Sequence, residues 1–107
     1  MRLTFTFLLA CCSPFIIQAQ CASDEVEVSI LVEIDAYGYE IYWELLPSGN
    51  NCGNGAIFSG GNSAVGCNGG ENQSQTPGGY ANDVNITEGP WCLSDGEDYD
   101  IVFIDDW

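Results

Sequence analysis

The chain divides sharply near residue 19, and this division decides which residues a folded domain can use. Arg2 precedes a largely apolar run without acidic residues, and Ile17 and Ala19 occupy suitable positions ahead of a cleavage site. A positive start, an apolar stretch and small residues at the end are the pattern of a secretory signal. Residues 1–19 are therefore predicted to be a signal peptide that is removed from the mature protein.

Two other interpretations of this segment remain open. A transmembrane anchor would need a longer apolar run, and Ser13-Pro14 interrupts this one. A lipoprotein signal is the second alternative, because Leu8–Cys11 resembles a lipobox with Cys11 as the acylated residue. The apolar run continues past Cys11, however, which favours the cleaved signal.

Removing the first 19 of 107 residues leaves residues 20–107, an 88-residue domain with four cysteines. A domain of this size is marginal without covalent or metal support, and an even cysteine number in a secreted chain predicts two disulfides. Three pairings are possible. We favour Cys52–Cys67, which would close a Gly/Asn-rich loop, and this leaves Cys21–Cys92 to tie the N-terminus to a late strand. Zinc is disfavoured because there is no CxxC pair and no histidine.

The domain is acidic throughout. All 16 Asp and Glu residues follow residue 19, and Arg2 is the only basic residue of the chain, so residues 20–107 carry a side-chain charge of −16. Such a surface repels nucleic acid and anionic membranes and attracts cations and basic partners. We therefore expect no nucleic-acid partner and no membrane insertion after signal cleavage.

Two early segments alternate between apolar and polar residues with the period of a strand. Residues 26–34 place five aliphatic side chains on one face, and residues 39–45 place Trp43 among inward-facing positions, with Glu40 and Glu44 outward. Residues 35–38 read as a turn. The two segments are therefore predicted to pair as an antiparallel hairpin.

The rest of the chain predicts shorter strands around a long loop. Residues 49–79 are rich in Gly, Asn and Ser and contain two short apolar patches, at 56–58 and 64–65, that we interpret as edge strands. Residues 80–86 are a weaker strand, and Gly89-Pro90 is read as a turn.

Residues 98–105 form the strongest late strand, with apolar side chains on both faces, so we expect it to be buried on both sides. No helical period is present outside the signal. The fold prediction is an all-β, small antiparallel β-sandwich with a long Gly/Asn-rich loop.

Catalytic chemistry is narrowly restricted. Without His or Lys, residues 20–107 lack the usual general bases and the Ser-His and Cys-His nucleophile pairs. A pair of carboxylates could still hydrolyse glycosides, but an acidic surface supplies such pairs by chance. We therefore expect a protein that is not an enzyme, with a carboxylate-dependent glycosidase as an alternative.

Calcium is the only cofactor that the composition suggests, because it binds carboxylate and carbonyl oxygens. Candidate ligands are Asp35, after the first strand, and Asp105 and Asp106, at the end of the last strand. No EF-hand spacing is present, and a solvated acidic surface is the competing interpretation.

Some aromatic side chains could bind glycans, and some Asn residues could carry them. The aromatic residues not assigned to the core could stack on sugars: Tyr37, Tyr42, Tyr80, Trp91 and Trp107. Filling a small core is the alternative use of such residues. Asn72 and Asn85 stand in glycosylation sequons, which would matter only in a eukaryotic source.

Two segments of the sequence, Asp35–Leu45 and Cys92–Trp107, together resemble a secreted repeat module of cell-surface proteins from marine Bacteroidetes and some algae. Asp35–Leu45 is similar to the family's D-x-Y-G-x-E-x-x-W-x-L strand pair, and Cys92–Trp107 to its C-L-x-x-G-x-C-Y-x-x-x-x-x-D-x-W-G-D-G end strand. The resemblance implies a β-sandwich module without a settled activity. Asp98 replaces a cysteine that is frequent in the family. The family's Gly-Asp-Gly would follow Trp107, so we expect a domain that is incomplete at its C-terminus.

These observations predict a secreted or cell-surface, non-catalytic module for adhesion or ligand binding, assisted by calcium. Its partner would be an extracellular glycan or protein. A structural spacer without any ligand is the main alternative, and the signal peptide, the cysteines and the acidic surface are compatible with both.

Overall fold

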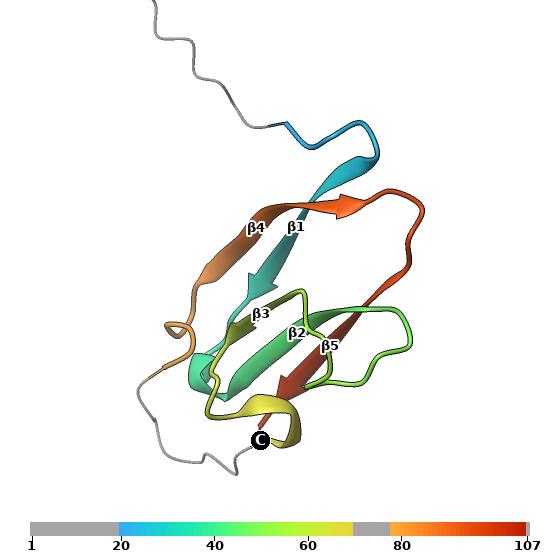
Figure 1. Ribbon diagram of the computed structural model, residues 1–107. Coiled ribbons are helices and arrows are strands. Elements are labelled where there is room, and N and C mark those ends of the chain that lie inside the picture. Colours follow the sequence, from blue (N-terminus) through green and yellow to red (C-terminus); the bar gives the residue numbers. More distant parts are fainter. Residues whose placement is uncertain (1–19, 70–77, 107) are drawn as a thin grey trace, which may run out of the picture.

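The computed structural model describes residues 20–69 and 78–106, so the predicted signal peptide lies outside the described residues (Figure 1). These residues form strands and two short 3-10 helices and contain no α-helix. The elements are β1 (Glu25–Glu33), η1 (Gly38–Glu40), β2 (Ile41–Pro47), β3 (Phe58–Gly61), η2 (Gly66–Asn68), β4 (Asn85–Ser94) and β5 (Tyr99–Asp105).

The strands form two antiparallel sheets, which confirms the predicted all-β class. One sheet has two strands in the order β1-β4, and the other has three in the order β3-β2-β5 (Figure 1). Buried side chains of both sheets belong to a single core: Val32, Ile34, Ile41, Trp43, Leu45 and Leu93. Two separate sheets that share one core are consistent with the predicted sandwich.

The predicted hairpin of the first two strands is wrong. β1 pairs with β4, from Glu25↔Ser94 to Glu33↔Asn85, whereas β2 pairs with β3 and β5. The connection between β1 and β2 contains the predicted turn, at Ala36-Tyr37. A distant segment also binds this connection, because the Ile34 amide donates to the Val84 carbonyl and the Asp83 amide to the Asp35 carbonyl. The chain therefore passes from one sheet to the other between these strands.

The predicted turn at Gly89-Pro90 is also wrong, because this dipeptide lies inside β4. The register jumps from Val28↔Trp91 to Ile30↔Glu88, so two residues of β4 face Ser29 alone. Such a bulge interrupts the ladder and accommodates a proline, which has no amide hydrogen to donate. The predicted strand at residues 80–86 is therefore shifted: β4 begins at Asn85 and continues through the bulge to Ser94.

The outer face of β2 is covered, contrary to the expectation for Glu40 and Glu44, which are only 8% and 4% exposed. Glu44 accepts hydrogen bonds from the Gly53 amide at 2.7 Å and from the Tyr42 hydroxyl at 2.7 Å. Gly53 belongs to the Gly/Asn-rich loop, which therefore folds over this face. These two donors offset the cost of burying a carboxylate in a domain without basic side chains.

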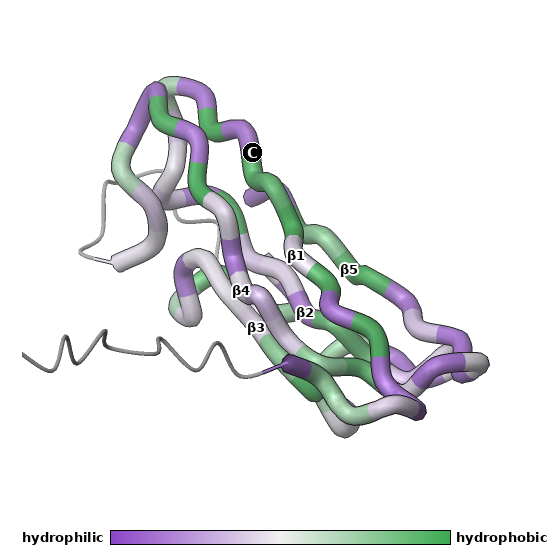
Figure 2. The backbone as a smooth tube through the Cα atoms, turned by 90° about the horizontal axis from the view of Figure 1, so that it is seen from above, coloured by the Kyte–Doolittle hydropathy of each residue, from purple (hydrophilic) through white to green (hydrophobic). Residues whose placement is uncertain are grey.

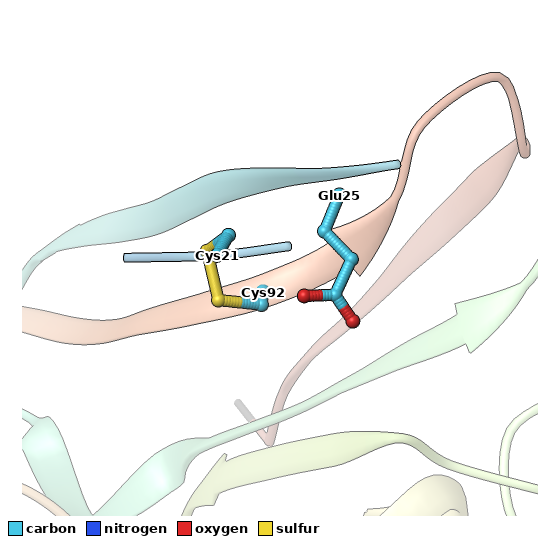
Figure 3. Close-up of side chains that lie close together, drawn as sticks. All are labelled: Cys21, Glu25 and Cys92. Carbon is cyan, nitrogen blue, oxygen red and sulfur yellow. A yellow bond between two sulfur atoms is a disulfide. The ribbon is translucent and has the colours of Figure 1, made fainter. Parts of the chain in front are cut away.

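Both favoured disulfides are present. Cys52–Cys67 closes the Gly/Asn-rich loop, and Cys21–Cys92 joins the segment before β1 to β4. Glu25 lies beside Cys21–Cys92 and accepts a hydrogen bond from the Ala22 amide (Figure 3). The N-terminal end of the domain is therefore fixed to the strand that pairs with β1.

We predict that the two disulfides stabilise the fold unequally. Cys21–Cys92 spans 71 positions and Cys52–Cys67 spans 15, and a cross-link that closes a longer loop restricts the unfolded chain more. The chain-entropy relation gives a loss of about 4 kcal/mol for Cys21→Ala/Cys92→Ala and about 3 kcal/mol for Cys52→Ala/Cys67→Ala. Urea unfolding of both double variants measures these losses, and a larger loss for the short loop would contradict the prediction.

Candidate functional site

A groove lies where the edge of β1 meets the inner face of β5. Its cavity has a volume of about 180 Å³. The lining residues are Ile30, Leu31, Val32, Glu33, Trp43, Ile101 and Phe103. Since successive side chains of a strand point to opposite faces, four consecutive lining residues of β1 place the cavity against the edge of that strand. Figure 2 shows apolar stretches of β1 and β5 side by side at this place.

The β5 side of the groove is apolar and uncovered. Ile101 and Phe103 are 54% and 52% exposed, so the expectation that this strand is buried on both sides is wrong. Ile101 pairs with Leu45, and Phe103 pairs with Trp43. Cross-strand partners share a face of the sheet, so these two exposed side chains lie on the same face as the buried core of β2.

Unequal sheet widths explain this exposure. Trp91 of β4 stacks on Phe58 of β3 with ring centroids 4.6 Å apart, and the buried residues of β1 share a cluster with those of β2. The two strands of one sheet thus cover β3 and β2, and the inner face of β5 projects beyond them. The local sequence pattern of β5 could not reveal that its inner face is exposed, because this exposure depends on the number of strands in the other sheet.

The groove ends in an acidic cavity. A second cavity of about 170 Å³ is lined by Glu33, Asp35, Ile41, Phe103 and Asp105. Glu33 and Phe103 line both cavities, so the two cavities adjoin each other. The groove therefore changes along its length from an apolar floor to a rim of three carboxylates.

The predicted calcium ligands are only partly brought together. Asp35 and Asp105 line the acidic cavity with Glu33, which the sequence reasoning did not select. Asp106 is 9% exposed, and its side chain lies beside Gly69. It is not one of the residues that line the two cavities. Asp105 is the last residue of β5 and Asp106 follows the strand, so the two neighbouring aspartates do not share the cavity.

Within the described residues, groups of Cys, Asp or Glu side chains close enough together to hold a metal ion occur only around the two disulfides. Cys21 and Cys92 lie with Glu25 (Figure 3), and Cys52 and Cys67 lie with Glu44. Their sulfurs are bonded to each other and offer no thiolate to a metal. Neither cluster is therefore a metal centre.

Most of the described aromatic residues considered for sugar binding serve the fold. Trp91 and Tyr80 pack against the core, and Tyr42 bonds to buried Glu44, whereas Tyr37 is 51% exposed. Trp107 and the sequon of Asn72 lie outside the described residues, and Asn85 is exposed at the start of β4. A stacking platform of several exposed rings is thus absent from the described part of the chain.

A hydrogen-bonded chain fixes the Trp43 ring beneath the groove. Trp43 is 1% exposed, and its Nε1 donates to the Tyr80 hydroxyl at 2.8 Å, which donates to Glu88 Oε1 at 2.6 Å. A Cβ on Gly60 would lie 2.6 Å from both Trp43 Nε1 and the Tyr80 oxygen, so this position needs glycine. Burial and the hydrogen bond to Glu88 raise the pKa of Tyr80 to about 12.

No protein-family model, no curated protein and no solved structure matches this chain. In residues 20–69 and 78–106, no helix is long and apolar enough to span a membrane.

We predict that the Tyr80 link weakens in strong base. Because the folded-state pKa lies above the ordinary value of 10.0, folding holds the protonated phenol, and its contribution is complete below pH 10. It is lost as pH rises from 10 towards 12. In chemical unfolding, the free energy of unfolding should fall across this pH range. The fall should be smaller in Tyr80→Phe than in the unchanged protein, and Tyr37→Phe should not alter it. An identical pH dependence in Tyr80→Phe would contradict the assignment.

Proposed function

We propose that this protein is a secreted or cell-surface module that binds a ligand without catalysis, in an adhesive role. The observation that carries the proposal is the groove, where Ile101 and Phe103 stay about half exposed beside a carboxylate rim. Contiguous exposed apolar surface on a small domain is typical of interaction sites. A structural spacer has no need for such a surface, so the groove favours binding.

Two further observations support the extracellular part of the proposal. Two disulfides are typical of an oxidising compartment. Residues 1–19 carry the signal-peptide pattern. The resemblance of Asp35–Leu45 and Cys92–Trp107 to a secreted surface module points the same way.

The chemistry of the groove supports binding over hydrolysis. Its ionisable residues are the carboxylates Glu33, Asp35 and Asp105, and residues 20–107 contain no His, Lys or Arg to act beside them. A glycosidase needs one carboxylic acid held protonated and a second one ionised across the bond. The groove instead offers an apolar surface continuous with negative charge, which suits a ligand that is apolar at one end and cationic at the other.

Binding can be tested on arrays of extracellular proteins and of glycans with the full chain and the variant Ile101→Thr/Phe103→Thr. We expect a ligand whose signal falls at least about tenfold in this variant, the equivalent of about 1.4 kcal/mol. Ile57→Thr is the matched control, because Ile57 is exposed outside the groove. Blank arrays, or signals that the double variant retains, would refute binding through the groove, and hydrolysis of an arrayed glycan would favour the glycosidase.

Calcium assistance is a separate part of this proposal. Asp35 and Asp105 share the acidic cavity with Glu33, so a cation there would reduce the mutual repulsion of three carboxylates. We expect millimolar calcium to raise the melting temperature beyond the effect of sodium chloride at equal ionic strength, since ligand binding to the folded state stabilises it. Asp105→Asn should reduce this rise, and Glu97→Gln should not. Equal shifts with the two salts would eliminate the calcium site.

A further inference from the structure

We propose that the groove accepts an extended segment of a basic partner protein, which adds as a third strand to the free edge of β1 and covers the inner face of β5. The inference rests on the proposed binding function and specifies its ligand. Four features of the groove carry it: the difference in sheet width, the unpaired edge, the size of the cavity and the distribution of charge.

The difference in width sets the place of the added strand. β4 and β1 cover β3 and β2, and the next position in the two-stranded sheet lies beside β1, above β5. A strand at this position would give both sheets three strands. Its inward-facing side chains would bury Ile101 and Phe103, which are now about half exposed.

The edge of β1 is available for pairing. Within the described residues β1 forms a ladder only with β4, so its other edge presents unpaired amides and carbonyls. The cavity lies directly against this edge, as its lining by Ile30–Glu33 shows. Peptides that add to an exposed sheet edge gain affinity from backbone hydrogen bonds and specificity from pockets for alternate side chains.

The apolar cavity fits one large side chain. Its volume of about 180 Å³ is comparable with an apolar cavity of roughly 150 Å³ that holds a benzene molecule. Trp43, Ile101 and Phe103 are among the residues that line it. A leucine or aromatic residue of the partner therefore suits this position.

The negative charge of the acidic cavity favours a partner with a basic side chain. The acidic cavity adjoins the apolar one, and side chains two residues apart in a strand project to the same side. A Lys or Arg two residues from the apolar anchor would therefore reach Glu33, Asp35 and Asp105. A second copy of this domain has a side-chain charge of −16 and no basic residue to offer, so repulsion disfavours self-association through this face.

Selection from a displayed library of random dodecapeptides against the full chain, produced by secretion, tests the proposal. We expect the recovered peptides to place a leucine or aromatic residue two positions from Lys or Arg. Phe103→Thr should weaken their binding at least about tenfold. Asp105→Asn should weaken binding and reduce its salt dependence, whereas Ile57→Thr and Glu97→Gln should leave it unchanged. Methylation of alternate peptide amides should abolish binding, because a strand that pairs with β1 must donate to it.

Each other result has a definite meaning. Strand addition by a basic segment would be overturned by any of three results. The recovered peptides could lack basic residues, the Phe103→Thr variant could still bind them, or the library could yield no binder. A dimer in sedimentation that Phe103→Thr dissociates would identify a second copy as the occupant and would also overturn it. Array binding that depends on the groove, combined with failure of the peptide experiment, would leave the proposed function in place and reject only this ligand.

Discussion

The fold depends on the burial of Trp43 between the two sheets. Its ring is in contact range of Trp91, with centroids 5.8 Å apart, and its Nε1 reaches the Tyr80 hydroxyl. Trp43, Trp91 and Tyr80 come from β2, β4 and the segment before β4, so one side chain connects parts of the chain that are distant in sequence. Gly60 completes the arrangement, because any larger residue there would separate Trp43 from Tyr80.

The same packing leaves the groove open. Two strands fold over a sheet of three, and the aromatic contacts place them above β3 and β2. The apolar residues of β5 then remain on the inner face without a covering strand, although Phe103 lies directly across from Trp43. Exposed apolar area costs about 25 cal/mol per Å² relative to burial, so this surface favours any partner that covers it. An exposed apolar surface thus follows from the architecture itself.

Local patterns predicted β1, β2 and β5 but not their partners, and they missed most of β4, whose Gly89-Pro90 was read as a turn. The alternation of residues 26–34 located β1, and the apolar run within residues 98–105 located β5. The Gly/Asn-rich loop between Cys52 and Cys67 favoured the disulfide pairing that the structure contains. Pairing of β1 with β4 instead of β2 depends on hydrogen bonds between residues 34–38 and 80–84, a contact that no local pattern encodes.

The candidate site was anticipated only in part, for the same reason. Asp35 and Asp105 were selected from their positions at strand ends, and they share a cavity. Glu33, Ile101 and Phe103 were missed, because alternation assigns a residue to a face and does not show whether another strand covers that face. The burial of Glu44 was missed similarly, since it depends on how the disulfide-closed loop folds over β2.

Solvent access to the groove tests the central claim most directly. The methyl groups of Leu31 and Ile101 can be compared with those of Val32 and Leu45 by NMR in the presence of a soluble paramagnetic chelate. Leu31 and Ile101 are 61% and 54% exposed, against 5% and 3% for Val32 and Leu45, so the first pair should lose signal at low chelate concentration and the second pair should not. Equal protection of all four residues in the monomer would contradict the account, because it would mean that the chain itself already covers β5.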